Sequence, residues 1–159
     1  MKLYHGSNVN IESIDLSKSK PNKDFGKGFY LSGNEEQAFA MASQKVIQME
    51  SGSETINVYE FEERHLTDGS LNVKIFETYD EEWAEFILKN RNKKNTGKMH
   101  DYDIVVGPIV DDKVGVQIRL FMEEYIDITT LLNRLKFIKG MTVQYYFGTE
   151  RAIQTLKKL

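Results

Sequence analysis

The sequence contains no cysteine, which excludes disulfide bonds, thiolate metal sites and a cysteine nucleophile. It has only two prolines, Pro21 and Pro108, and neither an internal repeat nor a low-complexity segment. No apolar run is long enough to cross a bilayer. The opening residues, MKLYHGSNVN, lack the hydrophobic stretch of a signal peptide. These absences together predict a soluble cytoplasmic protein without a membrane partner.

Basic residues are not in excess, because 21 Lys and Arg face 24 Asp and Glu, for a net charge of -3. This balance argues against a globally basic nucleic-acid-binding protein but allows a local basic patch. Hydrophobic residues make up 40% and charged residues 28%, as is usual for a soluble globular protein. The length of 159 residues suits a single domain over 1–159. The three histidines, His5, His65 and His100, are too far apart in sequence to suggest a zinc motif, and no metal is expected.

Short segments of β-branched, aromatic and apolar residues predict strands, the first of which ends where Gly6 follows it. These segments are KLYH (2–5), GFYLS (28–32), TINVYEFE (55–62), YDIVVGPIV (102–110) and TVQYYF (142–147). Longer segments predict helices over 32–50, 78–91, 115–126, 128–138 and 149–159. The first of these helices begins with either a Ser32–Glu35 capping box or Asn34 as the cap. Residues 7–27 are polar and predict an irregular connection.

The predicted strands and helices do not alternate in a regular βαβ rhythm. The sequence also lacks a strand–GxGxxG–helix unit and a GxxxxGK[ST] loop, so neither common phosphate-binding motif is present. An α+β domain is therefore favoured over a doubly wound α/β fold.

Three stretches carry residues suited to ligand binding. In LYHGS (3–7), a histidine ends a strand and a glycine follows, where a ligand can approach the backbone. In FGKGFYLS (25–32), an aromatic ring follows a glycine-rich turn. In VQYYF (143–147), alternation places Gln144 and Tyr146 on one face of a strand. The first two stretches, taken alone, are explained better by a core histidine before a turn and by a packed tyrosine than by a site, and Gln144 in the third could simply face water.

In this order, the three stretches resemble the ADP-ribosyltransferase superfamily, in the branch that includes diphtheria toxin and the poly(ADP-ribose) polymerases. That branch carries His-Gly on its first strand, a Gly-x-Gly-x-Tyr segment later, and a third residue, usually Glu, on a strand near the C-terminus. His5-Gly6, GKGFY with Tyr30, and Gln144 match these positions. Over most of its length, the chain also resembles a bacterial family of this superfamily with a similar LYHGS…FGKGFYLT start, an EW…FI…NR helix and a YDIVxGP strand.

The resemblance implies a split, mostly antiparallel β-structure with flanking helices and a cleft that binds NAD as a substrate. It implies that His5 holds the adenosine-side ribose and that Gly6 binds the nicotinamide carboxamide through its backbone, assisted by Ser7. Tyr30 would stack on the nicotinamide ring. The segment Gly26, Lys27, Gly28 and Phe29 would shape this wall, with Lys27 facing a phosphate. Gln144 would bond to the nicotinamide ribose.

Gln144 is the main departure from the pattern of that branch. A neutral amide stabilises a developing cation less than a carboxylate does, because a neutral hydrogen bond contributes about 1 kcal/mol and a charged one about 1.5–3 kcal/mol. Single transfer of ADP-ribose is therefore expected rather than chain building, and inactivity stays open. Glu85, Asp103 and Glu150 are candidates for a substitute carboxylate, although charged residues near helix ends are usually solvated.

Three further features have simpler interpretations. The basic run Asn90–Lys98 is expected to be a solvated loop, since it has no aromatic residue for base stacking. Trp83, Phe86 and Ile87 are expected in the core. Asp111 and Asp112 are two adjacent acids in a turn, which rarely bind a metal alone.

The resemblance thus implies a mono-ADP-ribosyltransferase that uses NAD and modifies an unknown protein or nucleic acid. A toxin or defence role, with a neutralising partner or with delivery as an effector in place of a cytoplasmic location, is implied only by the superfamily. Two alternatives stay open. One is an NAD glycohydrolase with water as the acceptor, and the other is a catalytically silent domain that binds NAD or ADP-ribose.

Overall fold

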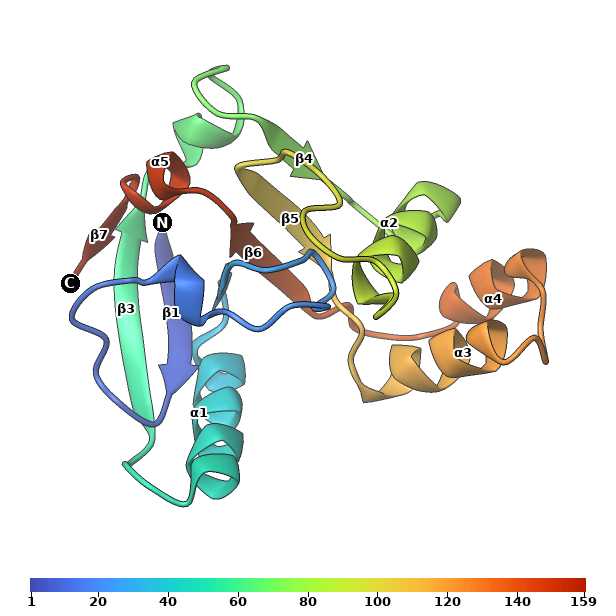
Figure 1. The fold of residues 1–159 in the computed structure, drawn as a ribbon, viewed down its shortest axis with the longest axis horizontal. Coiled ribbons are helices and arrows are strands. Elements are labelled where there is room, and N and C mark those ends of the chain that lie inside the picture. The colour runs from blue at the N-terminus through green and yellow to red at the C-terminus, as the bar shows by residue number, and fades with distance from the viewer.

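The computed structural model describes residues 1–159 and contains one seven-stranded sheet in the order β4-β5-β6-β2-β1-β3-β7 (Figure 1). Five of its six strand pairs are antiparallel, and only β4 with β5 is parallel. The mixed α/β architecture and the mostly antiparallel sheet agree with the sequence-based expectation. The strands are β1 (Lys2–Ser7), β2 (Phe29–Ser32), β3 (Thr55–Phe61), β4 (Val73–Ile75), β5 (Ile104–Pro108), β6 (Val143–Phe147) and β7 (Leu156–Lys158).

Five α-helices connect or follow these strands, and a polar side chain caps the N-terminus of each. They are α1 (Glu35–Met49), α2 (Glu81–Arg91), α3 (Asp112–Met122), α4 (Ile128–Leu135) and α5 (Glu150–Ile153). Asn34 caps α1 by accepting a bond from the Gln37 N–H, so the Ser32–Glu35 capping box is not formed. Two 3-10 helices, Leu16–Lys18 and Glu63–Leu66, lie in connections. No helix is both long and apolar enough to cross a membrane.

The core has two parts. A cluster that includes Trp83, Ile87, Val105 and Tyr146 packs α2, α3 and α4 against β5 and β6. A second cluster, which includes Leu3, Leu31 and Phe147, joins β1, β2, β3, β5, β6 and α5. Figure 1 shows α3 and α4 side by side at the end of the molecule opposite β7, and α1 packed along β1.

Several predicted boundaries are wrong. The helix expected over 115–126 is α3, which begins at Asp112 and ends at Met122, and the helix expected over 128–138 ends at Leu135. Two further differences change the sheet. Strand β1 continues through Gly6 to Ser7, because its partner β3 pairs along its whole length. The predicted helix over 149–159 ends at Ile153, and Leu156–Lys158 forms a strand that pairs with Tyr59–Phe61. An exposed edge of β3 is available at that point, and pairing with it overrides helix propensity.

The sheet is split between β1 and β2. These strands share one paired position, Tyr4 opposite Ser32. By contrast, β1 pairs with β3 at six positions, and β2 pairs with β6 at four. Beyond Tyr4 the two halves of the sheet separate, and the candidate site lies at this separation.

Candidate functional site

A cavity of about 320 Å³ lies where β1, β2 and β6 meet α1 and the end of α2. It brings together four residues that the sequence singles out, from positions up to 139 residues apart: His5, Gly6, Tyr30 and Gln144. The strand register explains the meeting of Gly6, Tyr30 and Gln144, whereas His5 alternates with Tyr4 and Gly6, so its side chain starts from the opposite face of β1. Tyr4 lies opposite Ser32, which lies opposite Gln144, and Tyr30 lies opposite Tyr146. Residues directly opposite in an antiparallel pair point to the same face of the sheet.

Gly6 contributes backbone groups to the site. Met1 and Phe61 exchange both backbone hydrogen bonds. Hydrogen-bonded and non-hydrogen-bonded pairs alternate along an antiparallel ladder, so the pair of Gly6 with Ile56 is a non-hydrogen-bonded one. The N–H and C=O of Gly6 therefore point away from β3, into the split between β1 and β2. The glycine is also needed for packing, because a Cβ there would lie 1.9 Å from the Ala38 carbonyl oxygen of α1. Gly6 therefore allows α1 to pack closely against β1, and its backbone N–H and C=O face the split.

His5 spans the split. Its Nδ1 lies 2.7 Å from the Tyr30 carbonyl oxygen, and its ring stacks on Phe29 with centroids 4.3 Å apart. A carbonyl only accepts, so Nδ1 carries the proton and Nε2 is left as an acceptor. Burial lowers the pKa of His5; the bond to Tyr30 opposes this shift, and the positive charges of Lys23 and Lys45 add to it. His5 is therefore neutral at pH 7.

Tyr30 has a structural role as well as a place in the cavity wall. Its hydroxyl donates to the Gly26 carbonyl at 2.7 Å and accepts from the Phe25 N–H at 3.0 Å. Burial raises its pKa well above the ordinary value, so the hydroxyl stays protonated. The Lys23 ammonium lies 5.0 Å from the centroid of the ring. Tyr30 thus fixes the preceding turn while its ring contributes to the cavity.

Gln144 is 9% exposed and faces the cavity. Its backbone lies between Ser32 and Gly107 in the sheet. The side-chain amide has no hydrogen-bond partner within the protein, and it is not one of the fully buried unpartnered groups, so it is open to the cavity. An unpartnered donor and acceptor in a cavity wall is what a hydrogen-bonding ligand requires.

The other predicted binding residues do not line the cavity. Ser7 is buried, and its hydroxyl accepts from the Val9 N–H. Gly26 has φ +96°, and a Cβ at Gly28 would lie 2.2 Å from the Tyr146 ring, so both glycines serve the turn. Lys27 is exposed, and its carbonyl accepts from the Tyr146 hydroxyl. Phe29 contributes by stacking on His5.

Sequence reasoning missed the rest of the cavity wall. Its charged residues are Lys23 and Asp24, from the loop before β2, and Arg91, from the end of α2. Asp24 is buried, and its Oδ1 accepts from Arg91 Nη1 at 2.6 Å while its Oδ2 accepts from the Val110 N–H at 2.7 Å. No local pattern places a loop residue beside a helix 67 positions away. The remaining lining residues are Tyr4, Asn22, Ser32, Ala38, Met41 and Ile109.

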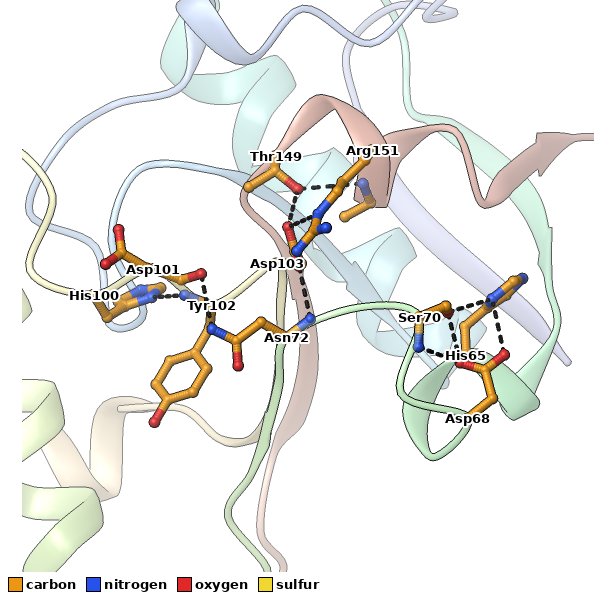
Figure 2. Close-up of polar contacts among 11 residues, drawn as sticks. His65, Asp68, Ser70, Asn72, His100, Asp101, Tyr102, Asp103, Thr149 and Arg151 are labelled. Atoms are coloured by element: carbon orange, nitrogen blue, oxygen red, sulfur yellow. Dashed lines mark hydrogen bonds and ion pairs between the residues drawn. The ribbon is translucent and has the colours of Figure 1, made fainter.

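None of the three proposed substitute carboxylates lies in the cavity wall. Glu85 and Glu150 are exposed on α2 and α5. Asp103 is buried in a hydrogen-bonded cluster with Thr149, Arg151 and the Asn72 N–H (Figure 2). Burial alone would raise the pKa of Asp103, but these partners lower it to about 2. Asp103 therefore joins α5 to β5 instead of facing a ligand.

The secondary features have structural roles. Trp83 and Ile87 are fully buried, and Phe86 packs against the same cluster, so their placement in the core is confirmed. Asp111 caps α3, Asp112 is exposed, and no group of three or more His, Asp or Glu side chains could hold a metal ion. The run 90–98 is only partly a solvated loop, because Asn90 and Arg91 belong to α2 and Asn90 is buried, whereas the lysines of the run are exposed.

A second cavity of about 380 Å³ borders the first at Ser32 but contains none of the other predicted residues. It is lined by uncharged side chains from β2, the start of α1 and β6.

The fold and the cavity define a mixed α/β protein with a candidate ligand site at a split in its sheet. The family model described as Protein of unknown function (DUF3990) matches residues 1–158, so the chain belongs to that family. No curated protein and no solved structure matches the chain.

Proposed function

We propose that this cavity binds NAD and that the protein transfers ADP-ribose from NAD to a macromolecular acceptor. The observation that carries the proposal is the meeting of His5, Gly6, Tyr30 and Gln144 in one cavity. These are the residues through which the sequence resembles the ADP-ribosyltransferases. The split between β1 and β2 also agrees with the split β-structure which that resemblance implies.

The available hydrogen-bonding groups fit the parts of NAD. The free N–H and C=O of Gly6 match the C=O and NH₂ of the nicotinamide carboxamide. The His5 Nε2 accepts from a ribose hydroxyl, and the Gln144 Oε1 accepts from a hydroxyl of the nicotinamide ribose. The Tyr30 ring offers an aromatic surface to the pyridinium ring.

In the reaction, the bond between C1′ of the ribose and the nicotinamide nitrogen breaks. Nicotinamide leaves as a neutral molecule with the bonding electron pair, and the ribose passes through an oxocarbenium-like transition state. The acceptor nucleophile attacks C1′ and loses its proton. The Gln144 oxygen stabilises the developing positive charge through its hydrogen bond to the ribose, as an oriented dipole.

One observation favours a second candidate, a domain that binds NAD without turnover. The only carboxylate in the cavity wall is Asp24, and both of its oxygens are already hydrogen-bonded. No free carboxylate is therefore available to stabilise the cation by charge.

Incubation of the protein with cell lysate and NAD labelled in its adenylate part separates these activities. Label on protein or nucleic acid supports transfer, whereas free labelled ADP-ribose supports hydrolysis with water as the acceptor. Binding of NAD without release of nicotinamide supports the silent domain. Absence of both binding and release contradicts all three.

A further inference from the structure

Two cationic side chains line the same cavity as Gln144. The sequence assigns no ligand role to Lys23 and places Arg91 in a run that is expected to be a solvated loop. Lys23 lies in the loop before β2, and Arg91 is the last residue of α2. We propose that Lys23 and Arg91 form an anion subsite that binds the diphosphate of a dinucleotide. This inference rests on the proposed function, since it assigns the charged middle part of the same ligand.

The loop that carries Lys23 is fixed on both sides of it. Asn22 donates to the Asn92 carbonyl at 3.2 Å, at the end of α2. Asp24 accepts from Arg91 and from the Val110 N–H. Lys23 lies between these two anchors, with its Nζ 5.0 Å from the centroid of the Tyr30 ring. These anchors fix the backbone of Lys23 beside the cavity, and its exposed side chain lines the cavity wall.

The positive charge around this end of the cavity is not neutralised. Asp24 is the only acidic residue of the wall, and it is paired with Arg91, so Lys23, Arg91 and Asp24 together carry one net positive charge. Lys23 has no acidic partner of its own. Burial lowers the pKa of Lys23, and the charges of Lys45 and Lys20 lower it further. A bound anion would relieve this repulsion.

Arg91 is suited to share such an anion. Its guanidinium has five N–H donors, and Nη1 is used for Asp24. The side chain is 37% exposed. The ion pair fixes the orientation of the planar group, and the remaining donors can contact phosphate oxygens.

Lys27, which the sequence suggested for the phosphate, provides a matched control. It belongs to the same segment and carries the same charge, but its side chain lies outside the cavity. A general attraction between a basic segment and a nucleotide would depend on both lysines, whereas a built subsite depends on Lys23.

The test is calorimetric titration of the whole protein with ADP and with adenosine, which lacks phosphates. We expect Lys23→Met to weaken ADP binding by about 10- to 100-fold, as for loss of a charge-assisted hydrogen bond. Adenosine binding should be unchanged, Lys27→Met should bind ADP as the native protein does, and Lys23→Arg should restore most of the affinity. Arg91→Lys, which keeps the partner of Asp24, should weaken ADP binding by removing the forked geometry.

Equal weakening by Lys23→Met and Lys27→Met, or no weakening by Lys23→Met, overturns the subsite, as does a native protein that does not bind ADP. The result separates from the proposed function. ADP binding that depends on Lys23, in a protein that neither binds nor cleaves NAD, retains the subsite and rejects the function. NAD binding that depends on Gln144 but not on Lys23 retains the proposed function and rejects the subsite.

Discussion

Replacement of Asp103 by asparagine tests whether this buried carboxylate holds the fold together or serves the site. Its two oxygens accept from Thr149 Oγ1 at 2.6 Å, from Arg151 Nε at 2.8 Å and from the Asn72 N–H at 2.7 Å, and the Arg151 Nη2 also bonds to it. These contacts join α5 and the start of β4 to β5 (Figure 2). The carboxylate side chain is only 2% exposed.

The expected loss of stability follows from the pKa of Asp103. Its folded value of about 2 lies about two pH units below that of an unfolded aspartate, a difference of about 2.5 kcal/mol. Arg151 is 60% exposed, so solvent screens part of this interaction. We expect Asp103→Asn to lower the free energy of unfolding by about 2 kcal/mol, and Tm by about 4–8 °C.

The pH dependence provides a second readout. A carboxylate whose folded pKa is depressed stabilises the protein above its unfolded pKa, and the contribution disappears as pH falls through the folded pKa. Between about pH 5 and pH 2 the native protein should therefore lose this part of its stability, and the asparagine variant should lack that loss.

Urea unfolding at pH 7, followed by circular dichroism, measures the change, with Asp101→Asn as the control because Asp101 is exposed and forms no side-chain ion pair. Equal stabilities of the two variants would refute the structural role. A folded Asp103→Asn protein that has lost NAD binding would show that Asp103 serves the site.

Three further predictions concern the cavity. Gln144→Glu places a carboxylate beside the ribose and should speed nicotinamide release by about tenfold; an unchanged rate, measured by chromatography, argues against the role of Gln144. Tyr30→Phe leaves the Gly26 carbonyl and the Phe25 N–H unpaired, and should lower the free energy of unfolding by about 1–3 kcal/mol. The variant keeps the aromatic ring, so the NAD affinity of the folded variant should be nearly native. A large loss of affinity would show that NAD binding depends on the Tyr30 hydroxyl and not on its ring. Because the pKa of His5 is lowered, NAD affinity should be constant between about pH 7 and 8 and fall only in acid, once Nε2 is protonated; an affinity that already falls between pH 8 and 7 contradicts the neutral imidazole.

The sequence predicts those parts of the fold whose pattern is local. The alternation in VQYYF places Gln144 and Tyr146 on one face, and the register with β2 confirms it. The helix predicted over 78–91 ends at Arg91 as expected and begins three residues late, at Glu81. By contrast, β4 has only three residues, and β7 exists because β3 offers an unpaired edge. Such pairings depend on the rest of the sheet and leave no local signal.

The same limit applies to the site. His5, Gly6, Tyr30 and Gln144 are singled out by the order of three short motifs and the resemblance that they carry, and all four line one cavity. Lys23, Asp24 and Arg91 reach the cavity only through the docking of a loop onto the end of α2. Glycines are ambiguous in sequence for a related reason. A glycine is required both where a ligand approaches the backbone closely and where a side chain does, as the Tyr146 ring does at Gly28, and the sequence shows the same glycine in both cases.

Release of nicotinamide from NAD, compared between the native protein and Gln144→Ala, tests the central claim most directly. The cavity-facing amide of Gln144 makes no bond within the protein, so its removal should leave Tm nearly unchanged. The account predicts steady release by the native protein and a rate lower by about fivefold or more in the variant, with a smaller change in NAD affinity. No release above buffer, or equal release by both proteins, would contradict it.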